Sequence, residues 1–269
     1  MKKVAILIDA GFFIHKLQHI KKHYFKEKAL TPDIIIDVIY SLVHYHEKVN
    51  NDSGKERKLE LYRIYFYDCP PIDKQIKFPL PEQGQKTPKD KNFKLDESYI
   101  LRESLHKKLK QCRKIALRMG ELSGHGAWQL NELTLKNLLR GNKKWDQLTN
   151  SDFHYQCTQK QVDIKLGMDI TTLAYEKLVE VIVLVAGDSD FVPAAKLART
   201  KGIDFILDPL RHDINPDLSE HIDGIQSYNL TSALSHFFGV APNPKPIWWD
   251  EMMEKRKKKQ TKKRNKKNR

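Results

Sequence analysis

Residues 179–187 have the sequence VEVIVLVAG, and this stretch decides the fold that we expect for the chain. Its apolar residues form one short, nearly continuous run, which is typical of a strand buried on both faces of a parallel sheet. A second such run, VAILID at residues 4–9, ends in the carboxylate of Asp9. We therefore expect both segments to be strands of one parallel sheet.

Helical patterns alternate with further strand patterns along the chain. We predict strands at residues 59–68, 114–120 and 203–209, and helices at residues 31–46, 96–111, 190–202 and within 217–237. Thr31 is the expected N-cap of the first of these helices, and Pro32 takes its first position. Because strands that alternate with helices form a sheet covered on both faces, we predict a three-layer α/β fold with a mostly parallel central sheet.

The chain is expected to form one domain over residues 1–237. Two polar stretches, residues 69–94 and 121–160, are expected to be long insertions, irregular apart from a helical patch near residues 133–140. Residues 238–254 are predicted to be a linker, and its Trp- and Met-rich segment is expected to dock on the domain. A basic tail then completes the predicted organisation.

The tail, residues 255–269, holds eleven Lys or Arg residues and no acid, whereas the other 254 residues carry a net charge of only +3. A run of like charges with few apolar residues cannot bury a core, so we predict a disordered arm. Such an arm binds phosphate backbones without sequence preference, and more weakly as the salt concentration rises. The pattern favours nucleic acid as a partner over a tail that serves only solubility.

Several classes of protein are disfavoured by the sequence. No apolar stretch approaches the roughly 20 residues of a membrane helix, and Asp9 interrupts the N-terminal apolar run that a secretory signal would need. The three cysteines, Cys69, Cys112 and Cys157, are far apart and form no CxxC pair, so neither a disulfide framework nor a zinc module is predicted. We expect a cytoplasmic protein without membrane contact.

Five aspartates are predicted to gather at one edge of the sheet. Asp9 and Asp188 each follow the carboxyl end of a parallel strand, the edge at which open α/β sheets bind ligands. Asp163 and Asp169 precede the 179–187 strand, and Asp190 follows Asp188. Crowded carboxylates repel one another unless a cation neutralises them, and Mg²⁺ prefers oxygen ligands. We therefore predict a divalent metal site that activates water for attack on a phosphodiester.

Most of these acids also have a structural explanation. Asp190 would cap the helix in whose first turn Pro193 lies, and Asp163 or Asp169 would cap the helix before the strand. If one helix holds both Asp163 and Asp169, their side chains point roughly 120° apart and only one faces the site. If that helix starts at Asp169, Asp163 reaches the site from a loop. Asp9, which ends a buried strand beside Gly11, has the weakest structural explanation.

Basic residues near these acids have two interpretations. Lys160 and Lys165 are placed to contact the backbone phosphates of a substrate, although a solvated surface explains them equally well. His15, His19 and His23 recur every four residues and would share one face of a helix. We expect a solvated basic face there rather than a metal site, because nothing else nearby completes a coordination shell.

Three motifs carry a resemblance to a known family. They are Ile8-Asp9-Ala10-Gly11-Phe12, Lys160-Gln161-Val162-Asp163-Ile164 with Asp169 six residues after Asp163, and Ala186-Gly187-Asp188-Ser189-Asp190-Phe191-Val192-Pro193. In this order they resemble an NYN domain of the LabA/DUF88 type, in the PIN-like nuclease superfamily, over most of residues 1–210. The resemblance implies a compact Rossmannoid, PIN-like fold and a ribonuclease activity that depends on Mg²⁺ or Mn²⁺.

The resemblance also implies roles for the acids. Asp9, Asp188 and one or both of Asp163 and Asp169 would hold the metal, and Asp190 would be a further ligand or an outer partner. The middle of the chain departs from the family, because it offers no clear counterpart to the additional acid of many PIN domains. Asp68 is a distant candidate for that acid.

Two other functions compete with a ribonuclease. A haloacid-dehalogenase-like phosphatase also begins with an aspartate at a strand end, but it requires a second acid where this chain has Gly11. A non-catalytic RNA-binding or scaffold protein would use the basic tail on an inherited fold. The complete set of acids argues against this last alternative, since a lost site would be free to replace Asp9 or Asp188.

Overall fold

A six-stranded parallel sheet forms the centre of the part of the chain that the structure describes. The computed structural model describes residues 1–50, 56–187, 190–213 and 220–244. The strands lie in the order β12-β11-β10-β1-β4-β7, and every neighbouring pair is parallel. Their bounds are β1 (Lys3–Asp9), β4 (Glu60–Asp68), β7 (Ile115–Met119), β10 (Val181–Val185), β11 (Asp204–Asp208) and β12 (Gly224–Ile225). The predicted parallel sheet is confirmed, and β12 is an addition to it.

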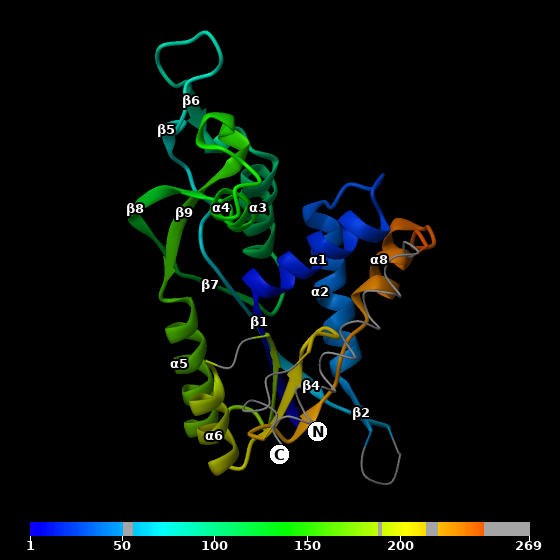
Figure 1. The fold of residues 1–269 in the computed structure, drawn as a ribbon. Helices are drawn as coiled ribbons and strands as arrows, with labels where there is room; N and C mark the ends of the chain where they lie inside the picture. Colours follow the sequence, from blue (N-terminus) through cyan, green and yellow to red (C-terminus); the bar gives the residue numbers. More distant parts are fainter. Residues whose placement is uncertain (51–55, 188–189, 214–219, 245–269) are drawn as a thin grey trace, which may run out of the picture.

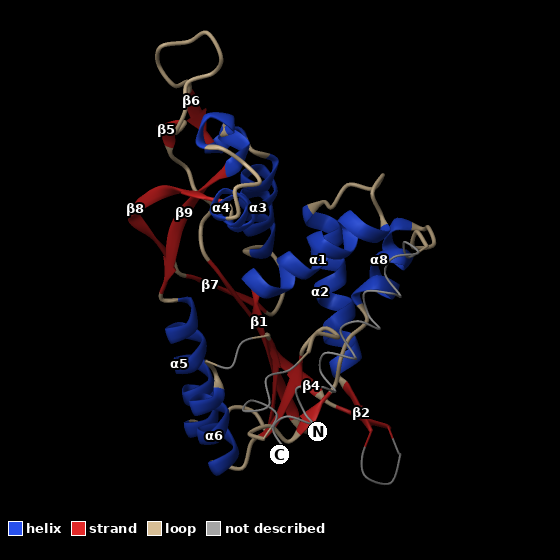
Figure 2. Cartoon of the chain, viewed as in Figure 1, coloured by secondary structure: helices blue, strands red, loops and turns tan. Residues whose placement is uncertain are grey.

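Helices cover both faces of the sheet, as Figure 2 shows. One face packs against α1 (Ala10–Tyr24), α2 (Pro32–His46), α3 (Glu97–Leu109) and α8 (Leu230–Phe238). The other face packs against α5 (Val162–Tyr175) and α6 (Val192–Thr200). Alternate residues of β1 enter opposite cores: Ile6 belongs to the first and Leu7 to the second. This double burial explains the continuous apolar runs and confirms the three-layer α/β fold.

Local signals set the helix boundaries that the sequence predicted. The Thr31 hydroxyl accepts a hydrogen bond from the backbone N–H of Ile34 at 3.3 Å, and Pro32 opens α2. Gly202, just after α6, has φ +82°, a backbone conformation that favours glycine. The N-cap of α6 is Phe191 without a capping side-chain hydrogen bond. The expectation that Asp190 is this cap is therefore wrong, because α6 begins one residue too late for it.

The two polar insertions are more ordered than predicted, and they form an arm at one end of the molecule (Figure 1). Residues 121–160, expected to be largely irregular, contain a long antiparallel hairpin in which Glu121 pairs with Lys160. Its strands enclose the predicted helical patch. The elements of the arm are β5 (Gln75–Lys77), β6 (Asp90–Asn92), β8 (Glu121–Leu130), α4 (Glu132–Leu139), β9 (Phe153–Lys160) and the 3₁₀ turns η1 (Phe93–Leu95), η2 (Trp145–Gln147) and η3 (Asn150–Asp152).

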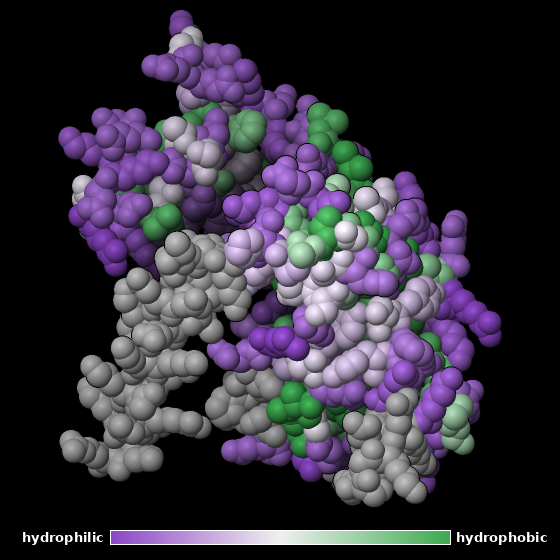
Figure 3. All heavy atoms as spheres, turned by 90° about the vertical axis from the view of Figure 1, so that its right-hand side faces the viewer, coloured by the Kyte–Doolittle hydropathy of each residue, from purple (hydrophilic) through white to green (hydrophobic). Residues whose placement is uncertain are grey.

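Aromatic side chains form a partly buried cluster in the arm. The Trp128 ring lies 5.6 Å from Phe78 and 5.5 Å from Tyr155, measured between centroids. The indole N–H of Trp128 donates to the Lys77 carbonyl at 2.8 Å, which ties β8 to β5. The tip of the arm, at the top of Figure 3, is hydrophilic.

Two short strands lie outside the central sheet and the arm. β2 (Lys48–Asn50) and β3 (Glu56–Lys58) form a separate antiparallel pair.

All three cysteines are free thiols. Across the described ranges, no helix is both long enough and apolar enough to cross a membrane. The predicted Trp- and Met-rich docking segment and the basic tail lie outside the described residues.

Gly120 joins β7 to β8 beside the start of α5, and the packing there is tight. A Cβ at residue 120 would lie 2.5 Å from the Lys160 carbonyl oxygen and 2.7 Å from Cγ2 of Val162. We expect Gly120→Ala to lower the free energy of unfolding by about 1–3 kcal/mol, because backbone must shift to accept the methyl group. Urea denaturation measures this, with Gly124→Ala of the same hairpin as control, since a Cβ there would meet no described atom within 4 Å. Equal stability of the two variants would contradict the tight junction.

Candidate active site

The candidate site lies where the strand order changes direction. From β1 the chain adds β4 and β7 on one side and later β10, β11 and β12 on the other, so the switch falls between β1 and β10. Open α/β sheets bind ligands in the crevice at the carboxyl ends of the strands at this point. Asp9 ends β1, Asp68 ends the neighbouring β4, and Asp188 follows Val185 of β10 by three residues. Asp188 itself lies outside the described residues.

Asp9 both caps α1 and faces other acids. Its Oδ1 accepts a hydrogen bond from the backbone N–H of Phe12 at 3.2 Å, so it has a structural purpose that the sequence analysis did not foresee. Burial raises the pKa of Asp9, the N–H groups of Phe12 and Gly11 act to lower it, and the charges of Asp163 and Asp68 raise it further. Three carboxylates therefore share one electrostatic environment.

Asp163 and Asp169 lie on one helix and have different surroundings. The helix α5 begins at Val162, after the left-handed Gln161, so the alternative in which it begins at Asp169 is wrong. Asp163 is in its first turn, where its charge acts on Asp9. Asp169 lies further along the helix and contacts Tyr67 and Arg118 instead.

Asp169 is held by two residues of the sheet. It accepts a hydrogen bond from the Tyr67 hydroxyl at 2.8 Å and a two-pronged ion pair from Arg118, with Nε at 2.9 Å and Nη2 at 3.2 Å. Burial and the Asp169 charge raise the pKa of Tyr67 far above its usual range. Arg118 thus supplies the counter-charge of Asp169, and a metal would have to compete with it.

Asp68, which the sequence offered only as a distant candidate for the site, ends β4. Only 2% of it is exposed, and its carboxylate lies 2.6 Å from Nε2 of His106 and 3.0 Å from Nη1 of Arg102. It also accepts the N–H of Cys69 at 2.8 Å. The signal that could have found it is its place at the end of a predicted strand, like that of Asp9.

Other charged residues lie at or near this edge of the sheet. Asp208 ends β11 but is fully buried against His46, with 2.8 Å between Oδ2 and Nε2. Lys165, a predicted phosphate contact, donates to the Met119 carbonyl at 2.7 Å, whereas Lys160 is exposed at the end of β9. Asp190 lines a groove together with Asp163.

The carboxylates suit a hard divalent cation in their chemistry. Within the described ranges, no three His, Cys, Asp or Glu side chains are arranged to hold a metal ion, a finding that also covers His15, His19 and His23. Asp188 lies outside these ranges. The fit rests on Asp9: it is partly buried beside two acids that oppose its ionisation, and a cation with oxygen ligands would relieve that repulsion.

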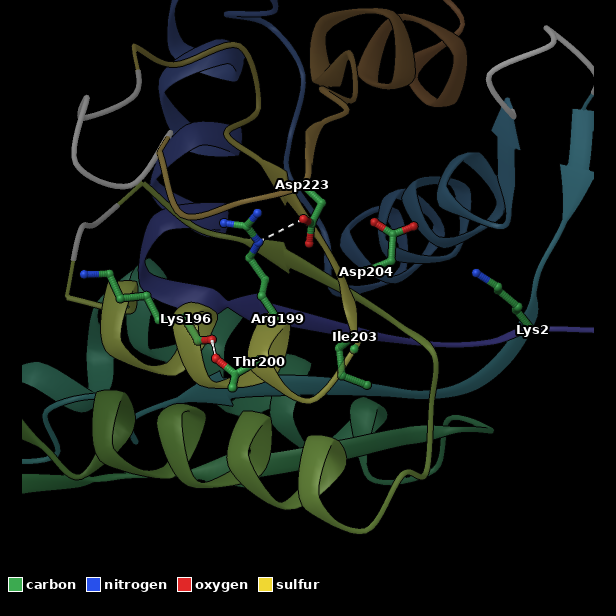
Figure 4. A pocket seen from close by; sticks show the side chains of 8 residues that line it. Lys2, Lys196, Arg199, Thr200, Ile203, Asp204 and Asp223 are labelled. Carbon is green, nitrogen blue, oxygen red and sulfur yellow. Dashed lines mark hydrogen bonds and ion pairs between the residues drawn. The ribbon is translucent and has the colours of Figure 1, made fainter.

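Hollows flank the acids on two sides. A pocket of about 200 Å³ is lined by Gly11, His15, Gln18, Ser98 and Arg102, on the side of Asp68. A groove of about 610 Å³ between α5 and α6 includes Asp163 and Asp190. A third groove, of about 820 Å³, lies at the opposite, amino-terminal edge of the sheet, where an Arg199–Asp223 ion pair lies beside Lys2 and Asp204 (Figure 4). The acidic site is not part of this third groove.

The chain has an α/β fold with acidic residues at the carboxyl ends of neighbouring parallel strands, beside a topological switch point. Residues 108–216 match the model of the NYN domain family. A solved structure of a protein of unknown function from Vibrio parahaemolyticus is similar at 11% identity and a TM-score of 0.43, over 85% of this chain and 93% of that chain. No curated protein matches the sequence.

Residues 108–216 of this chain are thus similar to NYN domains, which are generally nucleases of the PIN-like superfamily. The matched range contains Asp163, Asp169 and the Gly187–Phe191 motif, whereas Asp9 precedes it. The resemblance drawn from the motifs is confirmed for the domain.

We expect Asp9→Asn to stabilise the folded protein at neutral pH in the presence of EDTA. Because folding raises the pKa of Asp9, its ionised form costs free energy above that raised pKa, and the cost disappears as the pH falls to the ordinary value. Asparagine removes the charge but remains a good N-cap. Urea denaturation should give the variant the larger free energy of unfolding at pH 7, and equal values below about pH 4.

The control for this prediction is Glu132→Gln. A hydrogen bond from Lys136 lowers the pKa of Glu132, which is the opposite shift, so removing this charge should not stabilise the protein at pH 7. If Asp9→Asn is instead less stable than the wild type at pH 7, the prediction is wrong. The attraction between the Asp9 charge and the N–H groups at the start of α1 then outweighs its repulsion by Asp163 and Asp68.

Proposed function

We propose that this protein is a ribonuclease that hydrolyses RNA phosphodiester bonds with a Mg²⁺ or Mn²⁺ ion held by aspartates. The observation that carries the proposal is the group of carboxylates at the switch point of a fold whose residues 108–216 match the NYN family, with Asp9 partly buried beside Asp163 and Asp68. We further propose the LabA/DUF88 type, a cytoplasmic location, and a domain over residues 1–237 followed by a linker and a basic tail.

The residues of the chain divide the chemical work among them. Asp9, Asp163 and Asp188 would hold the cation, which supplies charge neutralisation and a more acidic bound water. The first turn of α1 orients Asp9 through the Phe12 N–H. Asp190 is a further or outer partner, and Asp169 joins the ligands only if it leaves Arg118.

Arg102 is placed to receive the substrate strand on the other side of Asp9. Its guanidinium is fixed by the ion pair with Asp68 while its side chain lines the 200 Å³ pocket. Arginine, histidine and serine side chains are suitable donors for phosphate and ribose oxygens. Lys160, exposed at the end of β9, offers a further contact to the backbone.

A second candidate function is RNA binding without cleavage. The observation that favours it is that the protein neutralises some acids by itself, Asp169 through Arg118 and Asp68 through Arg102. A haloacid-dehalogenase-like phosphatase is less favoured, since Gly11 stands where a second acid is needed and its Cβ position lies only 3.2 Å from Oδ1 of Asp9.

Cleavage of a labelled single-stranded RNA in Mg²⁺ or Mn²⁺ tests the proposal. We expect Asp9→Asn, Asp163→Asn and Asp188→Asn each to lower the cleavage rate at least about 100-fold, because loss of even an outer partner of a metal commonly costs 10–100-fold. A matched control is Asp204→Asn, at the opposite edge of the sheet, where burial raises the pKa of another carboxyl. This control should cleave at the wild-type rate.

Equal cleavage by all of these variants, or no loss with a chelator, would refute the catalytic assignment. Binding without cleavage by the wild type would favour the scaffold. Turnover of small phosphate esters with a phospho-aspartate at Asp9 would favour the phosphatase.

Deletion of residues 255–269 should weaken RNA binding and flatten its dependence on salt. Eleven basic residues lie in this segment, and each phosphate contact on a single strand adds about 0.7 to the slope of log affinity against log salt concentration. Titrations of labelled RNA at several salt concentrations measure the slope, and thermal unfolding should show that the domain stays folded. An unchanged slope would contradict a role for the tail.

A further inference from the structure

The groove between α5 and α6 is continuous with the acidic site and has a mostly apolar lining. Asp163 and Asp190 are among its lining residues, and Asp163 is also one of the acids that act on Asp9. Ile164 and Met168, one helical turn apart on α5, line it as well, with 67% and 64% of their surfaces exposed. We call this hollow the α5–α6 groove.

Residue 167, which lines this groove, is a glycine, and the packing around it does not require one. Glycine weakens the interior of a helix relative to alanine. Gly167 has no positive φ, and a Cβ there would meet no described atom within 4 Å. Asp163, Gly167 and Thr171 are spaced four residues apart and form one stripe along α5. The missing side chain therefore leaves space in the groove just beyond the acid.

The lining also restricts what the groove can bind. None of the described residues that line it is basic, and its acids repel a bare phosphate. The backbone of a nucleic acid is thus poorly suited to the groove, whereas the lining, which includes Met168 of α5 and Leu197 of α6, suits a neutral and partly apolar group. A nucleobase has this chemistry, and it is attached to the strand whose phosphate lies at the acids.

We propose that the α5–α6 groove binds the nucleobase next to the scissile phosphate and that Gly167 keeps the space for it. This inference rests on the ribonuclease function proposed above. A leucine at residue 167 projects into the groove, displaces the base and leaves the phosphate contacts on the Arg102 side in place. The variant folds normally, because leucine is a better helix former than glycine.

Fluorescence anisotropy with two labelled strands tests the proposal. The strands are an oligouridylate and an abasic strand with the same number of phosphates, and the parent protein is full-length Asp188→Asn with Mg²⁺. We expect the parent to bind the oligouridylate roughly tenfold more tightly than the abasic strand. Adding Gly167→Leu should remove most of that preference by weakening the oligouridylate about tenfold, while the abasic strand keeps its affinity.

Thr200→Leu is the matched control, since it adds a leucine on α6 in the groove at the opposite edge of the sheet. It should alter neither affinity, and thermal unfolding should show that both leucine variants are folded. If the parent binds both strands equally, or if Gly167→Leu leaves the preference unchanged, the proposal that the groove binds a base is wrong. RNA cleavage by the wild type would still support the ribonuclease proposal. A wild type that neither cleaves nor binds RNA overturns the ribonuclease proposal, and the groove with it.

Discussion

Repulsion among carboxylates at one edge of a parallel sheet is the constraint on which the site depends. Parallel strands deliver their last residues to the same edge, and two neighbouring strands, β1 and β4, end in Asp9 and Asp68. The first turn of α5 adds Asp163. Burial makes this repulsion costly, as the raised pKa of Asp9 indicates, so the fold must supply counter-charges or accept a cation.

The protein supplies counter-charges selectively. Arg118 neutralises Asp169, and Arg102 and His106 lie against Asp68. Asp9 is instead held by backbone N–H groups at the start of α1, which stabilise its charge only in part. This unequal treatment supports our proposal that a cation binds beside Asp9, next to acids that the protein itself neutralises.

The two sides of the crevice are lined by side chains of different chemistry. Polar donors, including Arg102, line the small pocket near Asp68, whereas apolar side chains and Gly167 line the groove beyond Asp163. This difference supports our proposal that the site binds an RNA strand, with its phosphates and bases on different sides. The arm places β9 directly before α5, so the tight junction at Gly120 also determines where Asp163 lies.

The sequence by itself determined the layered fold and the acids at the strand ends, because continuous apolar runs and the turns after them are local patterns. Only the tertiary structure decided which acids meet. Asp68 joins Asp9 because β4 pairs with β1, and Asp169 turns to Arg118 because β7 pairs with β4. The long hairpin within residues 121–160 was missed for the same reason. Strand order depends on packing between segments that are distant in the sequence, and strand patterns taken one at a time do not specify it.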